Sequence, residues 1–520
     1  MTMDVIVIGA GHNGLIAAAY LAKAGLRTTV LERRDVVGGA AVSEHPFGPD
    51  YTITSLSYVL SLMPPEIRRD LGLDLTVYPQ GPYFAPRRDG KALILHNDAG
   101  RRHQAIAAFS PADASAYEAY EEHLTDLGKV LGPLLHEIPP RLGSRKPLDL
   151  LRQARLAGQL RGIDTRGAVD VTRLLTGSIA DLLDRYFSSD AMRGVLSVSG
   201  VIGTWAGPRS AGTAYVMLHH HIGDTTWGFP RGGMGAVTSA LQASASSFGV
   251  SIRTGSEVAR IRTAGGRVRG VTLASGEELD AKIVITTAHP AISFLSLLDP
   301  AVLPSDFVAD IRNWQTRSGT VKINLALDRL PVFSAHPSPD PSVYGGTIVL
   351  AESLDDIENA FQQAVAGVPA ELPFADICIP SVFDDSLAPA GHHVMSLFTQ
   401  WVPSTWADSP GDLSGYADRV ISRVEAVAPG FTSSILHRQV IGPDAMQNEY
   451  GLVGGNIFHG ELSLGQMFHA RPAAGYADLR TPLRGLYQAG SATHGGGGVT
   501  GIPGRNVVRQ VLSDRRTRRV

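Results

Sequence analysis

A glycine-rich turn near the start of the chain constrains the fold more than any other feature. Apolar residues 5–8 run into Gly9, Gly11 and Gly14, and an alanine-rich stretch over 15–23 follows. Gly9 allows a tight turn, Gly11 lets bare backbone approach a pyrophosphate, and Gly14 lets a helix pack closely on a strand. The helix N-terminus adds amide donors and a positive dipole. The pattern predicts a dinucleotide-binding strand, turn and helix, with an ordinary connector as the plainer alternative.

The residues after this helix indicate which dinucleotide binds. Glu32 ends the apolar run 28–31 and can accept a hydrogen bond from a ribose 2′-hydroxyl. A glycine pair at 38–39 follows, where an FAD protein leads its backbone past the flavin side of the pyrophosphate. An acid at the ribose argues against a 2′-phosphate, although Arg33 and Arg34 are the residues that would bind one. The sequence therefore favours FAD, with NADP as a lesser alternative.

The C-terminus carries the other half of the predicted site. Residues 486–491 are typical of a short buried strand, and four glycines at 495–498 come next. We expect these glycines to let the main chain lie against a flat ligand and not to serve packing, while a disordered linker is the alternative. A helix that begins near Ile502 would point its amides at the flavin edge that gains negative charge on reduction.

A run of short strands completes the predicted nucleotide-binding fold. A turn over 228–235 opens a helix over 236–248, alternating residues from 250 to 279 predict a meander, and 282–288 predicts a buried strand of the parallel sheet. We expect Val258, in the meander, to cover the adenine. The predicted FAD-binding residues are Gly9, Gly11, Asn13, Gly14, Glu32, Arg33, Gly38, Gly39, Ala40, Val258, Gly490, Ser491, Gly498, Val499, Gly501 and Ile502.

These elements predict an α/β protein with two domains. A glutathione-reductase-type Rossmann domain that binds FAD, with a parallel sheet and a β-meander, would come from residues 1–75, 225–300 and 475–520. The inserted segments 76–224 and 301–474 would form an α+β substrate-binding domain over the flavin.

Composition excludes several classes of protein. Among 520 residues Cys378 is the single cysteine, so neither an intramolecular disulfide nor a redox dithiol can form. Cys378 would pack in a buried strand, with a covalent link to the flavin as the alternative. A net charge of -3 gives no sign of a nucleic-acid partner. The first strand begins by about Val5, which leaves no room for a signal peptide, and no apolar run approaches the roughly 18 residues that cross a bilayer.

One segment bears on membranes and on cellular location. Residues 148–163 mix leucine and alanine with Arg152, Arg155 and Arg161, as in a basic amphipathic helix. Such a helix can rest on anionic lipid and admit an apolar substrate, and ordinary surface packing is the alternative. We expect a cytoplasmic protein, mitochondrial if eukaryotic, with peripheral membrane contact as an open question and the oligomeric state undetermined.

The motifs, taken in order, resemble those of a known family. GAGHNG, ERRDVVGGAAVSE, WGFPRGGMGAV and GLYQAGSATHGGGGVTGIPGRN are similar to motifs of the bacterial-type phytoene desaturase family, within the amine-oxidase-like flavoprotein superfamily. GTVKINLALDRLPVF and GGNIFHGELSLGQMFHARP resemble more closely a branch of mitochondrial flavoproteins named for a pyridine nucleotide-disulphide oxidoreductase domain, member two. The resemblance covers nearly the whole chain and implies the fold given above. Ala40 stands where many superfamily members have arginine, so no arginine contact to the flavin is carried over.

Two residues are candidates for chemistry. His494 lies in the predicted flavin-binding turn, where the phytoene desaturase motif also has histidine, and both proton transfer and a structural hydrogen bond stay open. Lys322 lies in a predicted strand over 319–327, on the face opposite to Val321 and Ile323. In amine oxidases a lysine on such a strand reaches flavin N5 through water, so the resemblance makes Lys322 a candidate for an oxidase. A lysine that faces solvent is the alternative.

Other polar residues are weaker candidates. The histidines at 219–221 are adjacent, so their side chains diverge and do not converge on one metal ion, and no metal site is predicted. We expect one or two members of a larger polar set to face the substrate cavity: His219, His220, His221, His459, His469 and Arg471.

The sequence leads to an FAD-dependent oxidoreductase that removes hydride from a rather apolar small molecule. A flavin takes hydride at N5 and needs little more than a shaped, dry pocket. Desaturation of the phytoene desaturase type is the leading hypothesis. The alternatives are an amine or alcohol oxidase that produces hydrogen peroxide, a flavin-dependent isomerase, and a non-catalytic flavin-bearing regulatory protein. Because the sequence has no dithiol and no second G-x-G-x-x-G motif, the electron acceptor would be oxygen, a quinone or a protein.

Overall fold

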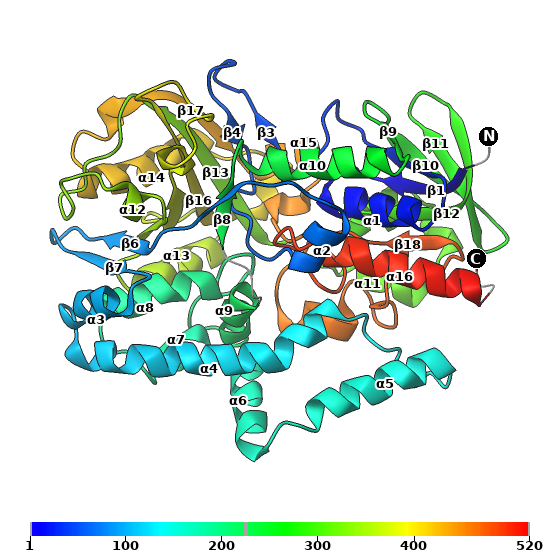
Figure 1. Ribbon diagram of the computed structural model, residues 1–520, viewed down its shortest axis with the longest axis horizontal. Coiled ribbons are helices and arrows are strands. Elements are labelled where there is room, and N and C mark those ends of the chain that lie inside the picture. Colours follow the sequence, from blue (N-terminus) through cyan, green and yellow to red (C-terminus); the bar gives the residue numbers. More distant parts are fainter. Residues whose placement is uncertain (1–2, 223–226, 518–519) are drawn as a thin grey trace.

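The computed structural model describes residues 3–222, 227–517 and 520. Two seven-stranded sheets lie beside each other, and helices pack on and around them (Figure 1). The strands of the first sheet come from the segments assigned to the FAD-binding domain, and those of the second come from the two inserted segments.

The first sheet has a parallel centre and an antiparallel extension. Its order is β10-β11-β12-β1-β2-β9, and β18 also pairs with β12. The pairs of β1 with β12 and β2, of β2 with β9 and of β12 with β18 are parallel, whereas β11 is antiparallel to both β10 and β12. The strands are β1 (Met3–Ile8), β2 (Thr28–Leu31), β9 (Ser251–Arg253), β10 (Val258–Ala264), β11 (Arg267–Leu273), β12 (Glu278–Thr286) and β18 (Leu486–Gln488).

Strand β12 joins the two parts of this sheet. The sequence predicts two separate strands here, but β12 runs unbroken from Glu278 to Thr286. Its residues alternate between exposed and buried up to Lys282 and are continuously buried afterwards. This change in burial is expected where a strand passes from a sheet with one solvent-exposed face into a parallel sheet that is covered on both faces. The exposed Asp280 and Lys282 interrupt the apolar run, and for this reason the sequence predicts two strands where the structure has one.

Three helices cover the cofactor end of the first sheet. Helix α1 (His12–Lys23) packs against both α10 (Met234–Ser247) and α16 (Ile502–Arg516). Residues 15–19 of α1 are fully buried, because the helix has neighbours on both sides as well as the sheet below it. Its alanines supply the short side chains that let these neighbours approach closely.

A buried ion network holds α16 to the end of the first sheet. Arg480 donates to both carboxylate oxygens of Asp514, at 2.8 and 2.6 Å, and also pairs with Asp478. Tyr487 of β18 donates to Asp514 at 2.9 Å. Both aspartates are buried, so the loss of one partner would leave an uncompensated charge, at a cost of about 3–5 kcal/mol. The network fixes α16 against β18.

The second sheet is mostly antiparallel. Its order is β17-β13-β16-β15-β14-β6-β7, and the pair of β6 with β14 is parallel. Its strands are β6 (Tyr83–Pro86), β7 (Ala92–Leu95), β13 (Ser318–Leu327), β14 (Thr347–Leu350), β15 (Ala375–Cys378), β16 (His393–Pro403) and β17 (Ile435–Ile441).

Both faces of the second sheet are covered. Val321, Ile323 and Leu325 pack with residues of α14 (Leu413–Val427) in one apolar cluster. Lys322 and Asn324 point to the opposite face, and they are buried as well, as is every residue of β13. The polar face of the sheet is therefore directed into the protein.

A helical layer covers the remaining side of the molecule (Figure 1). Its helices are α3 (Ala99–Ala107), α4 (Pro111–His136), α6 (Thr165–Thr176), α7 (Ile179–Leu183), α8 (Asp190–Ser197), α9 (Thr213–His221) and α13 (Leu354–Val365). Helix α5 (Pro147–Leu160) lies along an edge of the molecule (Figure 1). Within the described part of the chain, no helix combines the length and apolar character that a bilayer crossing needs.

Short elements connect these layers. They are β3 (Ser43–Glu44), β4 (Ile53–Thr54), β5 (Val77–Pro79), β8 (Gly228–Pro230), α2 (Pro65–Asp70), α11 (Ser305–Arg312), α12 (Pro341–Tyr344) and α15 (Pro443–Tyr450). Strand β3 pairs with β4, and β5 pairs with β8, which ties the first inserted segment to the turn before α10.

Candidate active site

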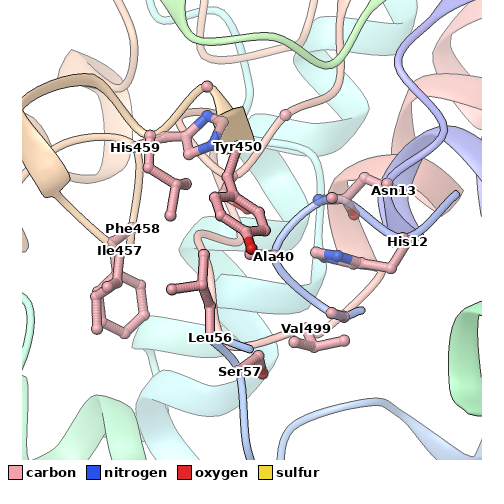
Figure 2. Close-up of a pocket in the computed structure, with 18 of the residues that line it drawn as sticks. His12, Asn13, Ala40, Leu56, Ser57, Tyr450, Ile457, Phe458, His459 and Val499 are labelled. Atoms are coloured by element: carbon pink, nitrogen blue, oxygen red, sulfur yellow. The ribbon is translucent and has the colours of Figure 1, made fainter. Parts of the chain in front are cut away.

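A cavity of about 360 Å³ reaches from the first sheet to the second. At one end its walls are the glycine-rich turns that follow β1, β2 and β18, and at the other end they are residues of β6, β14, β15 and β16. Figure 2 shows His12, Asn13 and Val499 on one side of this cavity and Phe458 and His459 on the other. One space therefore connects the predicted nucleotide site with the predicted substrate domain.

The structure brings most of the predicted FAD-binding residues to this cavity. The following line it: Gly9, Gly11, Asn13, Glu32, Arg33, Gly38, Gly39, Ala40, Val258, Gly490, Ser491, Gly498 and Val499. Gly14, Gly501 and Ile502 stand behind the lining and shape it. A β-carbon on Gly14 would lie 2.0 Å from the carbonyl oxygen of Gly9, so this glycine serves helix–strand packing. Gly501 precedes α16 with φ of 68°.

Two glycine turns face each other and form a cradle of bare backbone. A β-carbon on Gly39 would lie 3.5 Å from the α-carbon of Gly11. A β-carbon on Gly11 would meet nothing nearer than the Gly38 carbonyl oxygen, at 4.0 Å. The Gly38 amide donates to the Ala10 carbonyl at 2.9 Å, which fixes the spacing of the turns. Side chains here would occupy the space that a pyrophosphate needs.

The carboxylate of Glu32 is held rigidly at the edge of the cavity. Its Oε2 accepts a hydrogen bond from the Ala10 amide at 2.8 Å, and its Oε1 accepts one from the Arg34 amide at 3.0 Å. Each carboxylate oxygen has a further lone pair to offer. Val258 also lines the cavity, and its contact with the adenine stays a prediction.

The ends of the chain meet at this cradle. The Gly504 amide, in the first turn of α16, donates to Asn13 Oδ1 in the first turn of α1 at 3.3 Å. A β-carbon on Gly504 would lie 2.4 Å from the Asn13 carbonyl oxygen. Two helix N-termini therefore converge beside the cavity, and their positive ends favour an anionic ligand.

The expectation for the four glycines at 495–498 is wrong in one respect. They do serve packing, since a β-carbon on Gly497 would lie 2.4 Å from the Phe458 ring, and one on Gly498 would lie 2.8 Å from Leu62. Of the four, Gly498 lines the cavity, followed by Val499 with a positive φ of 55°. The run makes room for side chains of remote segments and also brings backbone to the ligand.

Two half-buried histidines line the cavity, and each has a buried ring nitrogen without a partner among the described residues. His12 Nε2 and His459 Nδ1 have no hydrogen-bond partner among the described residues. Burial lowers the pKa of both imidazoles to about 4, so both are neutral at physiological pH. Buried polar atoms in folded proteins are almost always paired. An oxygen-rich ligand such as FAD supplies the missing partners, and the residues of the cradle fit it.

His494 lies outside the cavity lining. Its Nε2 donates to the Leu134 carbonyl of α4 at 2.8 Å, and burial lowers its pKa to about 4. This hydrogen bond ties the C-terminal turn to the helical layer. A role of His494 in chemistry stays a prediction, and the geometry favours the structural alternative.

Lys322 is buried, so the alternative of a solvent-facing lysine is wrong. Its Nζ donates to Ser396 and lies 4.3 Å from the centre of the Tyr58 ring. Burial lowers the pKa of Lys322 to about 7. Tyr58 lines the cavity and Lys322 does not, so a role of Lys322 in chemistry stays a prediction.

The remaining polar candidates have separate surroundings. His220 lines the cavity, and its Nδ1 donates to the Val216 carbonyl at 2.9 Å. His469 donates to the Pro140 carbonyl at 3.1 Å, and Arg471 donates to several carbonyls, including that of Ser491 at 2.9 Å. Cys378 is buried in β15, as predicted. Burial raises the pKa of its thiol, which makes it a poor nucleophile for a covalent link.

Sequence reasoning missed many residues of the cavity lining, among them Tyr58, Tyr83 and Asp376. Asp376 offered a signal, because an acidic residue between apolar neighbours in a short strand must be buried or paired. Tyr58 and Tyr83 follow no motif, and their place depends on how distant strands pair.

The family of the chain follows from a match over nearly its full length. The family model for flavin containing amine oxidoreductases matches residues 14–504. The chain belongs to this family. It is therefore an FAD-dependent oxidoreductase, and the resemblance described above is confirmed.

Relatives of this flavin containing amine oxidoreductase match it over nearly the full length of both chains. Pyridine nucleotide-disulfide oxidoreductase domain-containing protein 2 of Rattus norvegicus is 39% identical, over 98% of this chain and 93% of its own. Phytoene desaturase (lycopene-forming) of a Paracoccus species is 24% identical, over 98% and 97%. The solved structure of cyclohexylamine oxidase from Brevibacterium oxydans is 16% identical, covers 99% of both chains and has a TM-score of 0.59.

The two glycines of the first turn give contrasting predictions. Gly11→Val leaves the fold intact, because its β-carbon has room, but weakens FAD binding at least about tenfold, or about 1.4 kcal/mol. Gly14→Ala destabilises the fold itself, by about 1–3 kcal/mol from overpacking, because its β-carbon overlaps the Gly9 carbonyl. The flavin-to-protein ratio and the melting temperature of the apoprotein check both. Equal flavin content in Gly11→Val and wild type would contradict the cradle.

Proposed function

We propose that this enzyme removes hydride from a rather apolar small molecule, in a dehydrogenation of the phytoene desaturase type. One observation carries the proposal: the cavity continues without a break from the FAD cradle to the face of the second sheet. A substrate held against that sheet lies beside the cofactor and away from bulk water. The electron acceptor in this proposal is oxygen, a quinone or a protein.

The lining of the cavity supports an apolar substrate. Leu56, Leu62, Ile202, Phe398 and Phe458 contribute apolar side chains between the cradle and the second sheet. Bound FAD supplies the hydride acceptor at flavin N5. These apolar side chains exclude water and orient the reacting carbon, and hydride transfer to a flavin requires little more from the protein. The phytoene desaturase relative, by its name, acts on a substrate of this character.

Anaerobic flavin reduction tests the proposal directly. Holoenzyme is mixed in a stopped-flow instrument with a panel of apolar compounds, both saturated hydrocarbons and compounds with an oxygen or nitrogen substituent. We expect at least one compound to bleach the visible flavin absorbance, with a rate that saturates as its concentration rises. Dithionite reduction is the control for a competent flavin. A flavin that dithionite reduces but no member of a broad panel reduces would contradict the proposal.

An oxidase of amines or alcohols is the second candidate, and Lys322 favours it. A buried lysine with its pKa lowered to about 7 is partly neutral at physiological pH, as proton transfer near a flavin requires. In this case turnover in air produces hydrogen peroxide.

Replacing this lysine separates the two candidates. If the enzyme is an oxidase, Lys322→Met slows flavin reoxidation by oxygen at least about tenfold, because the neighbouring cation that assists charge development is gone. Lys282→Met, at an exposed lysine of β12, is the matched control. Peroxide formation and stopped-flow reoxidation are the measurements. Normal oxygen reactivity in Lys322→Met, or no peroxide from any substrate, would remove this candidate.

Peripheral membrane contact through α5 forms part of the proposal. Leu150 and Leu151 are 47% and 67% exposed, next to the basic residues of the same helix. Arg152 donates to Gln510 of α16 at 3.1 Å, which connects α5 to the cofactor end of the molecule. Apolar and basic side chains on one exposed helix suit an anionic lipid surface.

Liposome co-sedimentation tests the contact. We expect wild-type protein to sediment with vesicles that contain anionic phospholipid, and a Leu150→Ser, Leu151→Ser double variant to stay in the supernatant, since both apolar anchors are lost. Val365→Ser, at an exposed valine of α13, is the control and should sediment like wild type. Wild-type protein that remains in the supernatant would exclude the contact.

A further inference from the structure

A polar cluster lies in the part of the cavity wall that the second sheet forms. Asp376 of β15 lines the cavity together with Tyr58, Tyr83 and Thr347. The Tyr58 hydroxyl lies near the Asp376 carboxylate and lowers its pKa. The Asp376 side chain is half-buried, and its enclosed Oδ1 has no hydrogen-bond partner among the described residues. The cavity wall thus contains a carboxylate, a strong hydrogen-bond acceptor, whose capacity to accept is not fully used by the described part of the protein.

The strand register sets what surrounds this carboxylate. Asp376 pairs with Phe398 of β16, and Phe398 pairs with Lys322 of β13. Residues directly opposite on antiparallel strands point to the same face, so the three form a row. The Lys322 ammonium lies over the Tyr58 ring, whose hydroxyl reaches Asp376. A buried cation therefore supports the carboxylate from behind, outside the cavity lining.

The charges in this row favour an uncharged donor. Burial raises the pKa of Asp376 to about 6, against the opposing effects of Tyr58 and Lys322, so the carboxylate is largely ionised at neutral pH. Burial lowers the pKa of Lys322 to about 7, so the lysine carries part of a positive charge at the same pH. An ionised buried oxygen without a donor is costly. A cationic ligand would meet the lysine charge, whereas a hydroxyl group would not.

We propose that Asp376 anchors the substrate by accepting a hydrogen bond from a hydroxyl group on an otherwise apolar molecule. The inference rests on the function proposed above and names its substrate class: an apolar alcohol. A plain hydrocarbon has no donor to offer the carboxylate. The apolar lining of Leu62, Ile202 and Phe398 holds the body of the molecule, and the anchor fixes one end of it.

Binding to the oxidised holoenzyme tests the anchor without any need for turnover. Cyclohexanemethanol and ethylcyclohexane serve as the matched pair, because a hydroxyl in the first replaces a methyl in the second. Dissociation constants come from anaerobic titration followed by the perturbation of the flavin spectrum. We expect Asp376→Leu to shift the ratio of the two constants at least about tenfold in favour of the hydrocarbon, the usual effect of losing a hydrogen bond to a charged group.

Two further variants keep the test decisive. Asp376→Asn retains an oxygen acceptor without the charge, so its ratio should fall between those of wild type and Asp376→Leu. If Asp376→Leu does not fold, the shift in Asp376→Asn decides the question. Asp280→Leu, at an exposed aspartate of β12 outside the cavity lining, is the matched control, and its ratio should equal that of wild type. Flavin content and melting temperature confirm the state of each variant.

Two results would overturn the proposal. The first is an unchanged ratio in the Asp376 variants. The second is a larger loss of affinity for cyclohexanemethylamine than for the alcohol at neutral pH, which would assign the anchor to cations. The spectral change on binding is read before any bleaching of the flavin, so the anchor is judged separately from flavin reduction, and a panel that fails to reduce the flavin would leave a hydroxyl-dependent ratio intact.

Discussion

The close crossing of two helices from opposite ends of the chain is the constraint on which the cofactor site depends. Gly504 has no space for a side chain beside the Asn13 backbone, and its amide bonds to the Asn13 side chain. The starts of α1 and α16 can therefore approach as closely as backbone permits. Both positive helix ends then favour the same anionic ligand, and the buried network of Arg480 and Asp514 holds α16 in this place from its other end.

The nucleotide half of the site could be predicted because its chemistry is local. A turn, an acid and a helix start are separated by fixed short distances, so the positions of Gly11, Glu32 and Val499 follow from spacing. The division of β12 shows the limit of the same approach. Charged residues on the wet face of a strand interrupt an apolar run without ending the strand.

The substrate half could not be predicted in the same way. Lys322, Phe398 and Asp376 become neighbours through the pairing of three strands that are distant in sequence. Alternation in β13 identifies the face to which Lys322 points, but not that this face is buried. Likewise, a run of glycines does not reveal what it makes room for: the backbone near Gly497 accommodates the Phe458 ring, while Gly498 and Val499 reach the cavity.

The use of both chain ends also has a consequence for biosynthesis. Strand β18 and helix α16, which complete the cradle, are synthesised after the N-terminal turns and after both inserted segments. A nascent chain that has not yet reached Leu486 already contains both turns of the N-terminal half, but it lacks the second helix end that faces the pyrophosphate. We therefore expect cofactor uptake to follow the synthesis of α16, because a translation product that stops short of α16 lacks part of the cradle.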